Sequence, residues 1–351
     1  MSEMSQKERE IILIVLEKGA MRSSAIYAEL IKKGAKTSLI TVKRMLSEMQ
    51  SQGALTILGR GRATNYLVSA LGRTFADINS HQYCAIEPDK RFGTKSFNFE
   101  LLQNIPSEIF SDDELKQLDI ATQEYWQRTK HIPVSIQKKE LERLVIELAW
   151  KSSKIEGNTY TLLDTERLIL KNEEPVGHDK KEAIMIINHK NAFNFIHENH
   201  EFFKTLNRAN LEKLHSILVK DMSVGLGLRQ KPVGITGSKY KPLDNFHQIS
   251  EAVEELSATI LKMKSPYAKS LMALLGISYI QPFEDGNKRT SRLMANALLL
   301  AHRCAPLSYR SVDENEYREA TIVFYEINSI TPFKKIFIDQ YDFAARNYTT
   351  R

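Results

Sequence analysis

The sequence predicts a mainly α-helical protein that carries a small module of helices and a hairpin at its N-terminus. Residues 1–70 show three short apolar stripes followed by two β-prone runs, and later segments repeat apolar residues at helical spacing. With 351 residues, the chain is too long for one typical core, so two or three domains are expected. The later helical segments are 140–155, 162–171, 181–203, 209–221, 248–263, 266–280, 287–302, 314–328 and 332–347.

Composition restricts the class of protein further. The chain is 42% hydrophobic and 26% charged, which is ordinary for a folded globular protein. Its two cysteines, Cys84 and Cys304, are far apart and do not indicate a disulfide framework. No apolar stretch reaches the length of a membrane span, and the polar N-terminus does not follow the signal-peptide pattern. We therefore expect a cytoplasmic protein with no membrane contact.

Residues 1–70 predict three helices followed by a hairpin. Each of the three apolar stripes is closed by a glycine, and Ser38 is a suitable N-cap for the third helix. Two strand-like runs, 54–58 and 64–68, flank the turn GRGRA. This order of elements resembles a winged helix-turn-helix domain.

The charge of this segment agrees with that resemblance. Residues 1–70 hold 11 Lys and Arg against 6 Asp and Glu, whereas the remaining chain holds 38 against 37. The resemblance implies that the third helix enters the major groove of DNA and that the wing contacts phosphates. The alternative is a charged surface on a dimerisation or scaffold module. The residues implied for DNA contact are Thr41, Lys43, Arg44, Arg60 and Arg62.

The rest of the chain divides into a connector and a helical domain. Residues 71–105 show few periodic signals and are expected to be the connector, and residues 106–351 are expected to be the helical domain. Within the latter, residues 107–137 look helical and polar. Thr161, with Asp164 three positions later, predicts a capping box at the start of a helix.

Residues 281–292, QPFEDGNKRTSR, are the segment that most clearly suggests chemistry. Pro282 blocks continuation of the preceding helix, and Phe283 is the apolar residue expected to anchor the loop in the core. Gly286 permits a positive φ and a close approach of the backbone to a ligand. A helix is predicted to begin near Asn287, and the free N–H groups of a helix N-terminus favour an anion. The segment therefore predicts a phosphate-binding loop.

Charged side chains around this loop suit a polyphosphate. Arg289 and Arg292 are three residues apart, so both project from one face of the first helical turns. Two guanidinium groups beside a helix N-terminus match phosphate oxygens. Asp285 adds one carboxylate, which makes sense among these cations if it holds Mg²⁺ between phosphate oxygens. The alternative is a helix N-cap loop whose arginines form surface salt bridges.

The complete segment resembles the signature of Fic-domain proteins, H-P-F-x-[D/E]-G-N-G-R-x-x-R. Proteins of that family are mostly helical and typically transfer AMP from ATP to a hydroxyl side chain of a target protein. The resemblance implies an all-helical Fic-like core that binds ATP with Mg²⁺. It assigns Asp285 to Mg²⁺, Gly286 and Asn287 to the α/β-phosphate pocket, Arg289 to the β-phosphate and Arg292 to the γ-phosphate.

Two positions depart from the family pattern. Gln281 stands where the family has the His that takes the proton from the target hydroxyl, and Gln has no group that titrates near neutral pH. Loss of a general base lowers a rate by about 10²–10⁴. Lys288 replaces a Gly and adds a cation to the phosphate site, as in the Doc branch, which phosphorylates its target. We expect nucleotide binding with impaired transfer; a natural degenerate member and a deliberately inactivated variant both fit.

Ser152 and Glu156 are four residues apart and so share one face of a helix expected around 140–157. With the glycine that follows, they resemble the Fic inhibitory motif, [S/T]-x-x-x-E-[G/N]. The resemblance implies that Glu156 pairs with Arg292 and obstructs the productive position of the γ-phosphate. The alternative is a helix that simply ends at Gly157.

Residues 233–243, VGITGSKYKPL, interrupt the helical pattern. Their β-branched residues flank a Thr-Gly-Ser turn, which predicts a β-hairpin. The segment resembles the Fic flap, whose exposed strand pairs with a segment of the target. Ile235, Thr236 and Gly237 are the residues that the resemblance implies for target binding, and a purely structural hairpin is the alternative.

Several functions remain open at this point. The first is a Fic-type protein adenylyltransferase that is autoinhibited by Glu156 and weakened by Gln281. The second is a DNA-binding transcriptional regulator whose degenerate Fic domain senses a nucleotide. The third is a Doc-like phosphotransferase, and the fourth is a scaffold. The expected partners are a target protein and DNA, and a homodimer is a further expectation because both resembled families often form dimers. His197 and His200 lack metal-site partners and are expected at the surface.

Overall fold

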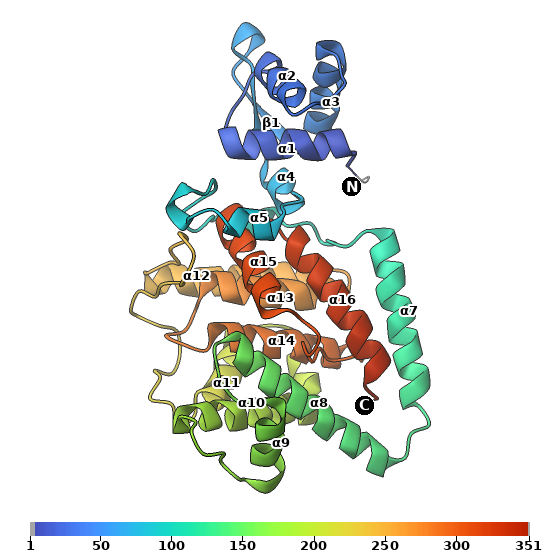
Figure 1. Ribbon diagram of the computed structural model, residues 1–351, viewed down its shortest axis with the longest axis vertical. Helices are drawn as coiled ribbons and strands as arrows, with labels where there is room; N and C mark the ends of the chain where they lie inside the picture. Colours follow the sequence, from blue (N-terminus) through green and yellow to red (C-terminus); the bar gives the residue numbers. More distant parts are fainter. Residues whose placement is uncertain (1–3, 350–351) are drawn as a thin grey trace. The chain divides into compact units, whose positions relative to one another are not determined.

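The computed structural model describes residues 4–349, which fall into two compact units. The first unit comprises the described residues up to Ile105 together with 235–241 and 319–334. The second comprises the other described residues. Figure 1 gives the order of the helices and strands along the chain. Residues 235–241 and 319–334 thus belong to the first unit, whereas the sequence suggested that all of residues 106–351 form the helical domain.

The first unit begins with three helices and a two-stranded antiparallel sheet. Ser5 starts the first helix with a capping box to Glu8, and Ser38 caps the third by accepting a hydrogen bond from the Thr41 N–H at 3.2 Å. The strands pair with Leu55 opposite Val68. The elements are α1 (Gln6–Lys18), α2 (Ser23–Lys32), α3 (Leu39–Ser51), β1 (Leu55–Leu58) and β2 (Asn65–Val68).

The connector continues the core of these elements. It contains the short helices α4 (Ala70–Thr74), α5 (Ser80–Cys84) and α6 (Leu101–Asn104), which are too short to produce a periodic sequence signal. Buried residues of the connector and of the three-helix module form one apolar cluster with Val323 and Ile327 of α15 (Glu314–Ile327). The first unit is thus held together by apolar burial between segments far apart in the sequence.

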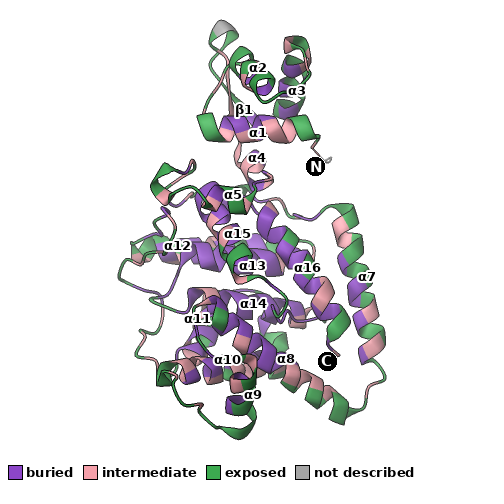
Figure 2. Ribbon diagram, in the orientation of Figure 1, coloured by how far each residue is buried: buried purple, intermediate pink, exposed green. Residues whose placement is uncertain are grey.

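The second unit is built on two buried helices that lie against each other. These are α13 (Pro266–Ile280) and α14 (Asn287–Ala301), and Figure 2 shows both buried along most of their length. Ser270 Oγ donates a hydrogen bond to the Ala295 carbonyl at 3.0 Å across their contact. The helices around them are α7 (Asp112–Thr129), α8 (Val134–Ile155), α9 (Leu162–Lys171), α10 (Lys180–Glu198), α11 (Arg208–Leu218), α12 (Phe246–Lys262) and most of α16 (Thr331–Asn347).

Two sequence expectations in the second unit have clear outcomes. The capping box of Thr161 and Asp164 is confirmed at the start of α9. The polar helix expected over 107–137 is instead divided, since α7 ends at Thr129 and Pro133 precedes α8. Proline disfavours the helical conformation in the residue before it and has no N–H to donate, which accounts for the break.

The prediction of a β-hairpin over residues 233–243 is wrong. Residues 235–238 form a turn in which the Ser238 N–H donates to the Ile235 carbonyl at 3.3 Å and Gly237 has φ +81°. Within residues 4–349, the strands that pair are β1 and β2 alone. Lys241 forms an isolated parallel bridge with Ser96 of the connector. Among residues 4–349, the β-branched residues that suggested a hairpin have no partner strand. The backbone after the turn forms its hydrogen bond with the connector instead, from the Lys241 N–H to the Lys95 carbonyl.

None of the helices in the described part of the chain is long and apolar enough to cross a membrane.

Candidate functional site

The candidate site begins where α13 ends. Gln281 takes the left-handed conformation, with φ +52°, and its N–H donates to the Ile277 carbonyl at 3.0 Å. Its side chain is buried, and Nε2 donates to the Ser278 carbonyl at 2.6 Å. Pro282 then turns the chain away from the helix, as predicted. The Gln281 side chain is therefore tied to the last turn of α13.

Phe283 and Asn287 close the loop on itself. Asn287 Oδ1 accepts from the Phe283 N–H at 2.8 Å, and Asn287 Nδ2 donates to the Phe283 carbonyl at 2.8 Å. The Phe283 ring is fully buried and stacks on the His215 ring with centroids 3.7 Å apart. The predicted anchoring role of Phe283 is confirmed, and Asn287 is a structural brace of the loop.

His215, on α11, is a site residue that sequence reasoning missed. Its Nε2 lies 3.0 Å from the Asp285 carbonyl oxygen, which only accepts, so Nε2 carries the proton. Burial lowers the pKa of His215 to about 4, because a charged ring would be desolvated there. Its Nδ1 has no hydrogen-bond partner among residues 4–349. His215 is therefore neutral at pH 7 and holds the loop through both its ring face and its N–H.

Arg229 is a second missed residue that holds the loop. Its Nε donates to the Gln281 carbonyl at 2.6 Å, and its backbone N–H donates to the Pro282 carbonyl at 2.9 Å. Its side chain is buried, and Nη1 also donates to the Lys231 carbonyl at 2.8 Å. Because Gln281 and Pro282 lie more than 50 residues from Arg229 in sequence, neither residue spacing nor periodicity signals these contacts.

The loop ends at a helix N-terminus that suits an anion. Gly286 has φ +78° and supplies no side-chain cap to α14, so the first N–H groups of the helix lack a side-chain acceptor from that residue. The Arg289 side chain is 2% exposed, and its Nη2 donates to Asp285 Oδ2 at 3.1 Å. The Asp285 side chain is 61% exposed. A buried guanidinium group thus lies beside an accessible carboxylate at the start of α14.

The predicted Mg²⁺ site at Asp285 fits this arrangement only if a bound nucleotide supplies further ligands. Among the described residues, no group of three or more His, Cys, Asp or Glu side chains is placed to hold a metal ion. Mg²⁺ is commonly bound through one or two carboxylates together with substrate phosphates. The single accessible carboxylate of Asp285 matches that donor set, so the residues present fit Mg²⁺ carried by a bound nucleotide.

Arg292 is fully buried and bound to the end of α8. Its Nε donates to Ser152 Oγ at 2.8 Å, and its Nη2 donates to the Ser152 carbonyl at 2.9 Å and to Glu156 Oε1 at 2.8 Å. Ser152 Oγ also lies 2.9 Å from Nε2 of His189, another buried histidine that sequence reasoning missed. The structure therefore brings Arg292 of α14 together with Ser152 and Glu156 at the end of α8.

Glu156 contacts a second cation of α14. Its Oε2 lies 3.7 Å from Lys288 Nζ, and its side chain is 20% exposed. Burial by itself raises the pKa of Glu156, but Arg292 and then Lys288 lower the pKa by more, so the net shift is downward. Glu156 is therefore a carboxylate at neutral pH and is held by both cations.

The end of α8 fixes the position of Glu156. The Asn158 N–H donates to the Ser153 carbonyl at 3.1 Å, and the Gly157 N–H, at φ +97°, donates to the Lys154 carbonyl at 2.9 Å. Arg318 Nε donates to the Ile155 carbonyl at 3.0 Å. The helix thus stops at Ile155, and Glu156 follows at its C-cap, near the end expected from the sequence.

The other predicted site residues lie in the first unit. Lys43 and Arg44 are exposed on α3, while Thr41 is half-buried and its hydroxyl lies 2.9 Å from Ser38 Oγ at the helix start. Arg60 is exposed, and the side chain of Arg62 lies outside the described part of the chain. Ile235, Thr236 and Gly237 form the turn described above. The two predicted surface histidines, His197 and His200, are half-buried and exposed, respectively.

The loop ends at the N-terminus of a helix that carries two buried arginines, an arrangement whose charge and free N–H groups suit a phosphate. The model of the Fic/DOC family matches residues 205–299, which run from just before α11 to near the end of α14. This part of the chain is a Fic/DOC domain.

Relatives and solved structures agree with the family match. The protein adenylyltransferase Fic of Nematostella vectensis is 25% identical over 202 residues, which is 52% of this chain and 44% of the relative. The chain thus spans less than half the length of that relative. C. elegans Fic-1 (aa134–508) is similar with a TM-score of 0.58 at 16% identity, covering 67% of this chain and 72% of that chain.

Two bacterial structures have the same fold. A Fic family protein from Desulfovibrio desulfuricans has a TM-score of 0.57 at 18% identity, covering 69% of this chain and 75% of that chain. A Fic domain containing signaling protein from Bacteroides thetaiotaomicron has a TM-score of 0.54 at 20% identity, covering 66% of this chain and 94% of that chain. At these identities the likeness establishes the fold.

Proposed function

We propose that the chain is an ATP-binding, Fic-type protein adenylyltransferase that is autoinhibited by Glu156 and weakened by Gln281. The observation that carries the proposal is the ion pair between Glu156 and Arg292, 2.8 Å long, at a helix N-terminus suited to phosphate. A buried arginine that pairs with a carboxylate from another helix is a cation in a position where an anionic ligand can replace that carboxylate. The name of the Nematostella vectensis relative supports the reaction class.

Different residues of the loop would hold different parts of the nucleotide. The N–H groups at the start of α14 and the Arg289 guanidinium group would hold phosphate oxygens, with Gly286 allowing the backbone to come close. Asp285 would hold Mg²⁺ against those oxygens. Asn287 acts through its brace to Phe283, which keeps the loop in this shape. When bound, ATP with Mg²⁺ would supply the AMP group for transfer.

Autoinhibition follows from competition for one guanidinium group. Arg292 cannot offer the same N–H groups to Glu156 and to a terminal phosphate at once. Since the pKa of Glu156 is lowered, this carboxylate stays charged and competes at neutral pH. ATP would thus bind with its terminal phosphate displaced, or only after Glu156 moves away.

Gln281 limits the reaction itself. A target hydroxyl must lose its proton as it attacks, and the Gln281 amide has no basic group to take that proton. Its Nε2 is moreover engaged with the Ser278 carbonyl. We therefore expect a slow transfer to a protein hydroxyl even after Glu156 is released.

The decisive experiment restores the base and removes the inhibitor together. The Gln281→His, Glu156→Gly variant is incubated with Mg²⁺ and ATP labelled at the α-phosphate, and protein labelling is measured. We expect labelling at least about 10²-fold above that of Glu156→Gly alone, which keeps Gln281. Gln281→Ala in the same background is the control for loss of the glutamine. Equal labelling of all three variants would refute the proposal.

The position of the label separates this reaction from a Doc-like phosphotransfer. Transfer of AMP gives a label from α-labelled ATP and none from γ-labelled ATP, and transfer of phosphate gives the reverse. Lys288 is the residue that suggests phosphotransfer, and it lies beside Glu156 in the structure. Mass spectrometry of the product distinguishes the two adducts independently.

We propose DNA binding by residues 4–68 as a second function. The observation that favours it is the exposure of Lys43 and Arg44 on α3, in the part of the chain that holds nearly all of the net positive charge. Arg44 forms a 3.9 Å ion pair with Glu48, and both side chains are largely exposed, so phosphate can replace this weak partner.

Binding to a generic duplex at several salt concentrations tests this function. Loss of one phosphate contact in Arg44→Ala should reduce the slope of log K against log salt by about 0.9. Arg167→Ala, which removes an exposed arginine of α9, is the matched control and should leave the slope unchanged. Salt-independent binding, or equal slopes in all proteins, would exclude a DNA-binding role for α3.

A further inference from the structure

Arg289, on α14, is a buried guanidinium group that is only partly supplied with hydrogen-bond acceptors. Its side chain is 2% exposed, Nη2 donates to Asp285 Oδ2 at 3.1 Å, and Nη1 donates to Met222 Sδ at 3.9 Å. Among residues 4–349, Asp285 and Met222 are its hydrogen-bond acceptors. A thioether sulfur is a weak acceptor, so the Nη1 side of Arg289 faces a group that satisfies it poorly.

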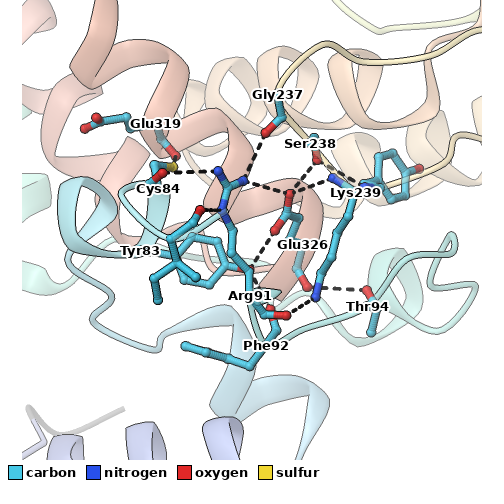
Figure 3. A network of polar contacts seen from close by, with 12 residues as sticks. Tyr83, Cys84, Arg91, Phe92, Thr94, Gly237, Ser238, Lys239, Glu319 and Glu326 are labelled. Carbon is cyan, nitrogen blue, oxygen red and sulfur yellow. Dashed lines mark hydrogen bonds and ion pairs between the residues drawn. The ribbon is translucent and has the colours of Figure 1, made fainter. Parts of the chain in front are cut away.

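Arg91, a buried arginine of the first unit, shows how such a group is fully paired. Its Nη1 lies 3.3 Å from Glu326 Oε1 and donates to the Gly237 carbonyl at 3.0 Å (Figure 3). Its Nε and Nη2 donate to carbonyls of the connector, those of Ile86 at 2.8 Å and Cys84 at 3.2 Å. Every nitrogen of this guanidinium group therefore has an oxygen acceptor, as the burial of a charge requires, and the group joins the connector, the turn 235–238 and α15.

The electrostatic environment of Arg289 agrees with its incomplete pairing. Burial lowers the pKa of Arg289, because the carboxylates near it compensate the buried charge only in part. Burial acts in the same direction on Arg292, but Tyr317 and Glu156 raise the pKa of Arg292 by more. Of the two buried arginines on α14, Arg289 is thus the one that a further acceptor would stabilise.

Met222 is the residue whose sulfur occupies that position. It lies in the segment that follows α11, where its N–H donates to the Val219 carbonyl at 3.1 Å and Asp221 has φ +60°. The Lys220 carbonyl accepts from Asn188 Nδ2 at 2.6 Å, which ties this segment to α10. Met222 itself is half-buried. The turn therefore holds the sulfur against the guanidinium group while the residue stays partly accessible to solvent.

We propose that Met222 is a redox modification site, at which oxidation to the sulfoxide gives Arg289 a new oxygen acceptor and opposes the binding of phosphate. The proposal rests on the proposed function, in which Arg289 holds a phosphate. The oxidant is hydrogen peroxide, whose O–O bond breaks as the sulfur gives up an electron pair. One oxygen atom becomes bonded to sulfur, and the other leaves as water with both protons. Methionine sulfoxide reductases reverse the change.

The contact with Arg289 is what distinguishes Met222 from an ordinary half-buried methionine. A sulfoxide oxygen is costly to bury unless it receives a hydrogen bond. Nη1 already points at the sulfur, so an oxygen on that sulfur obtains a charge-assisted hydrogen bond. A phosphate oxygen would then have to displace the sulfoxide oxygen, whereas the thioether offers only weak competition. Oxidation therefore weakens phosphate binding through the same guanidinium group that binds it.

Calorimetry on the full chain before and after oxidation tests the effect on binding. Glu156→Gly is treated with hydrogen peroxide, oxidation of each methionine is measured by peptide mass spectrometry, and the Kd for ATP–Mg²⁺ is determined. We expect the Kd to rise about three- to tenfold and to return after treatment with methionine sulfoxide reductases. Met222→Leu in this background should keep one Kd throughout. Met21→Leu, which removes a half-buried methionine of the first unit, is the matched control and should remain sensitive.

Three results of this experiment would overturn the proposal. The first is an unchanged Kd although Met222 is oxidised. The second is an equal rise in Met222→Leu, which would place the sensitive group elsewhere. The third is failure of Met222 to oxidise under conditions that oxidise Met21, because Met222 would then not be a modification site.

A comparison without nucleotide tests the contact itself. The carbonyl of a glutamine at position 222 imitates the sulfoxide oxygen, so Met222→Gln should unfold thermally at or above the midpoint of Met222→Leu. Met21 packs against the apolar core of the first unit, so Met21→Gln should unfold below Met21→Leu. A lower midpoint for Met222→Gln than for Met222→Leu would refute the acceptor role. If Glu156→Gly binds no ATP–Mg²⁺, the proposed function fails, and this comparison still decides whether Arg289 accepts an oxygen partner from position 222.

Discussion

Glu156 bridges two cations that lie one helical turn apart on α14: its Oε1 is 2.8 Å from Arg292 Nη2, and its Oε2 is 3.7 Å from Lys288 Nζ. The Arg292 side chain is fully buried, whereas the Lys288 side chain is 33% exposed. The first contact is therefore the stronger, because solvent screens the second more effectively. This asymmetry leads to two predictions on nucleotide binding.

Removal of the carboxylate should tighten nucleotide binding. In Glu156→Gly, Arg292 no longer has to exchange one anion for another, and we expect the Kd for ATP–Mg²⁺ to fall by about tenfold or more, which corresponds to about 1.4 kcal/mol. Isothermal titration calorimetry measures the change. Glu173→Gly removes an exposed loop carboxylate and is the control, with an expected Kd equal to that of the wild type. Equal affinities of all three proteins would show that Glu156 does not compete with the nucleotide.

Lys288 should affect the Kd in a way that depends on Glu156. In the wild type, Lys288→Ala removes a cation from the phosphate site but also frees Glu156 from one partner, so the two effects oppose each other. In Glu156→Gly only the first effect remains, and the Kd for ATP–Mg²⁺ should rise by about three- to tenfold. Calorimetry on the four proteins of this double-mutant cycle gives the coupling. Additive effects would contradict the shared contact.

Ser152→Ala should destabilise the second unit. It removes a hydrogen bond from Arg292 Nε and the contact with His189 Nε2, and it leaves buried polar groups unsatisfied at a cost of about 1–3 kcal/mol. Thermal unfolding should show a midpoint several degrees lower, at about 2–4 °C per kcal/mol. Ser153→Ala is a matched control, because the buried Oγ of Ser153 has no hydrogen-bond partner in residues 4–349. Similar midpoints for the two variants would contradict a structural role for the Ser152 hydroxyl.

His215 should make the fold sensitive to acid. Its folded-state pKa of about 4 lies below the value of about 6.5 for an unfolded chain, so its stabilising contribution is complete above pH 6.5 and is lost as the pH falls toward 4. The loss amounts to about 3 kcal/mol, since each pKa unit corresponds to about 1.36 kcal/mol. Thermal unfolding midpoints measured from pH 7 to pH 4.5 report this loss of stability.

The control for this effect is His215→Gln, which keeps a donor for the Asp285 carbonyl and does not titrate. Burial also lowers the pKa of His189, so the wild type and His215→Gln should both lose stability in acid. The prediction concerns the difference in thermal stability between the wild type and His215→Gln, which should become smaller as the pH falls. A constant difference across the range would mean that His215 contributes through packing alone.

Local features of the site were predictable because they depend on neighbours in the sequence. The end of a helix before Pro282, the positive φ of Gly286 and the start of α14 at Asn287 follow from backbone sterics within a few residues. The spacing of Arg289 and Arg292 follows from helix geometry in the same way. The Glu156–Arg292 pair was expected only from the family resemblance, because no local rule joins residues of two separate helices.

The expected β-hairpin shows the limit of local reasoning. The residues around Gly237 favour a strand by composition, yet their backbone bonds to Arg91, Glu326 and the connector. Strand formation depends on a partner edge, which sequence composition does not supply. The same limit explains why His215 and Arg229, which hold the loop from other segments, were not recognised.

The sequence by itself determined the helical architecture, the helix caps and the conformation of the loop 281–286, because apolar periodicity and backbone conformation act over a few residues. The tertiary structure decided which charged groups meet. Arg292 and Ser152 are 140 residues apart, and Arg91 and Glu326 are 235 apart. Such pairs form only where apolar burial has already brought their helices together, since a buried charge is stable only beside its partner. The folded core thus gives Arg292 its competing carboxylate and gives the turn its anchor.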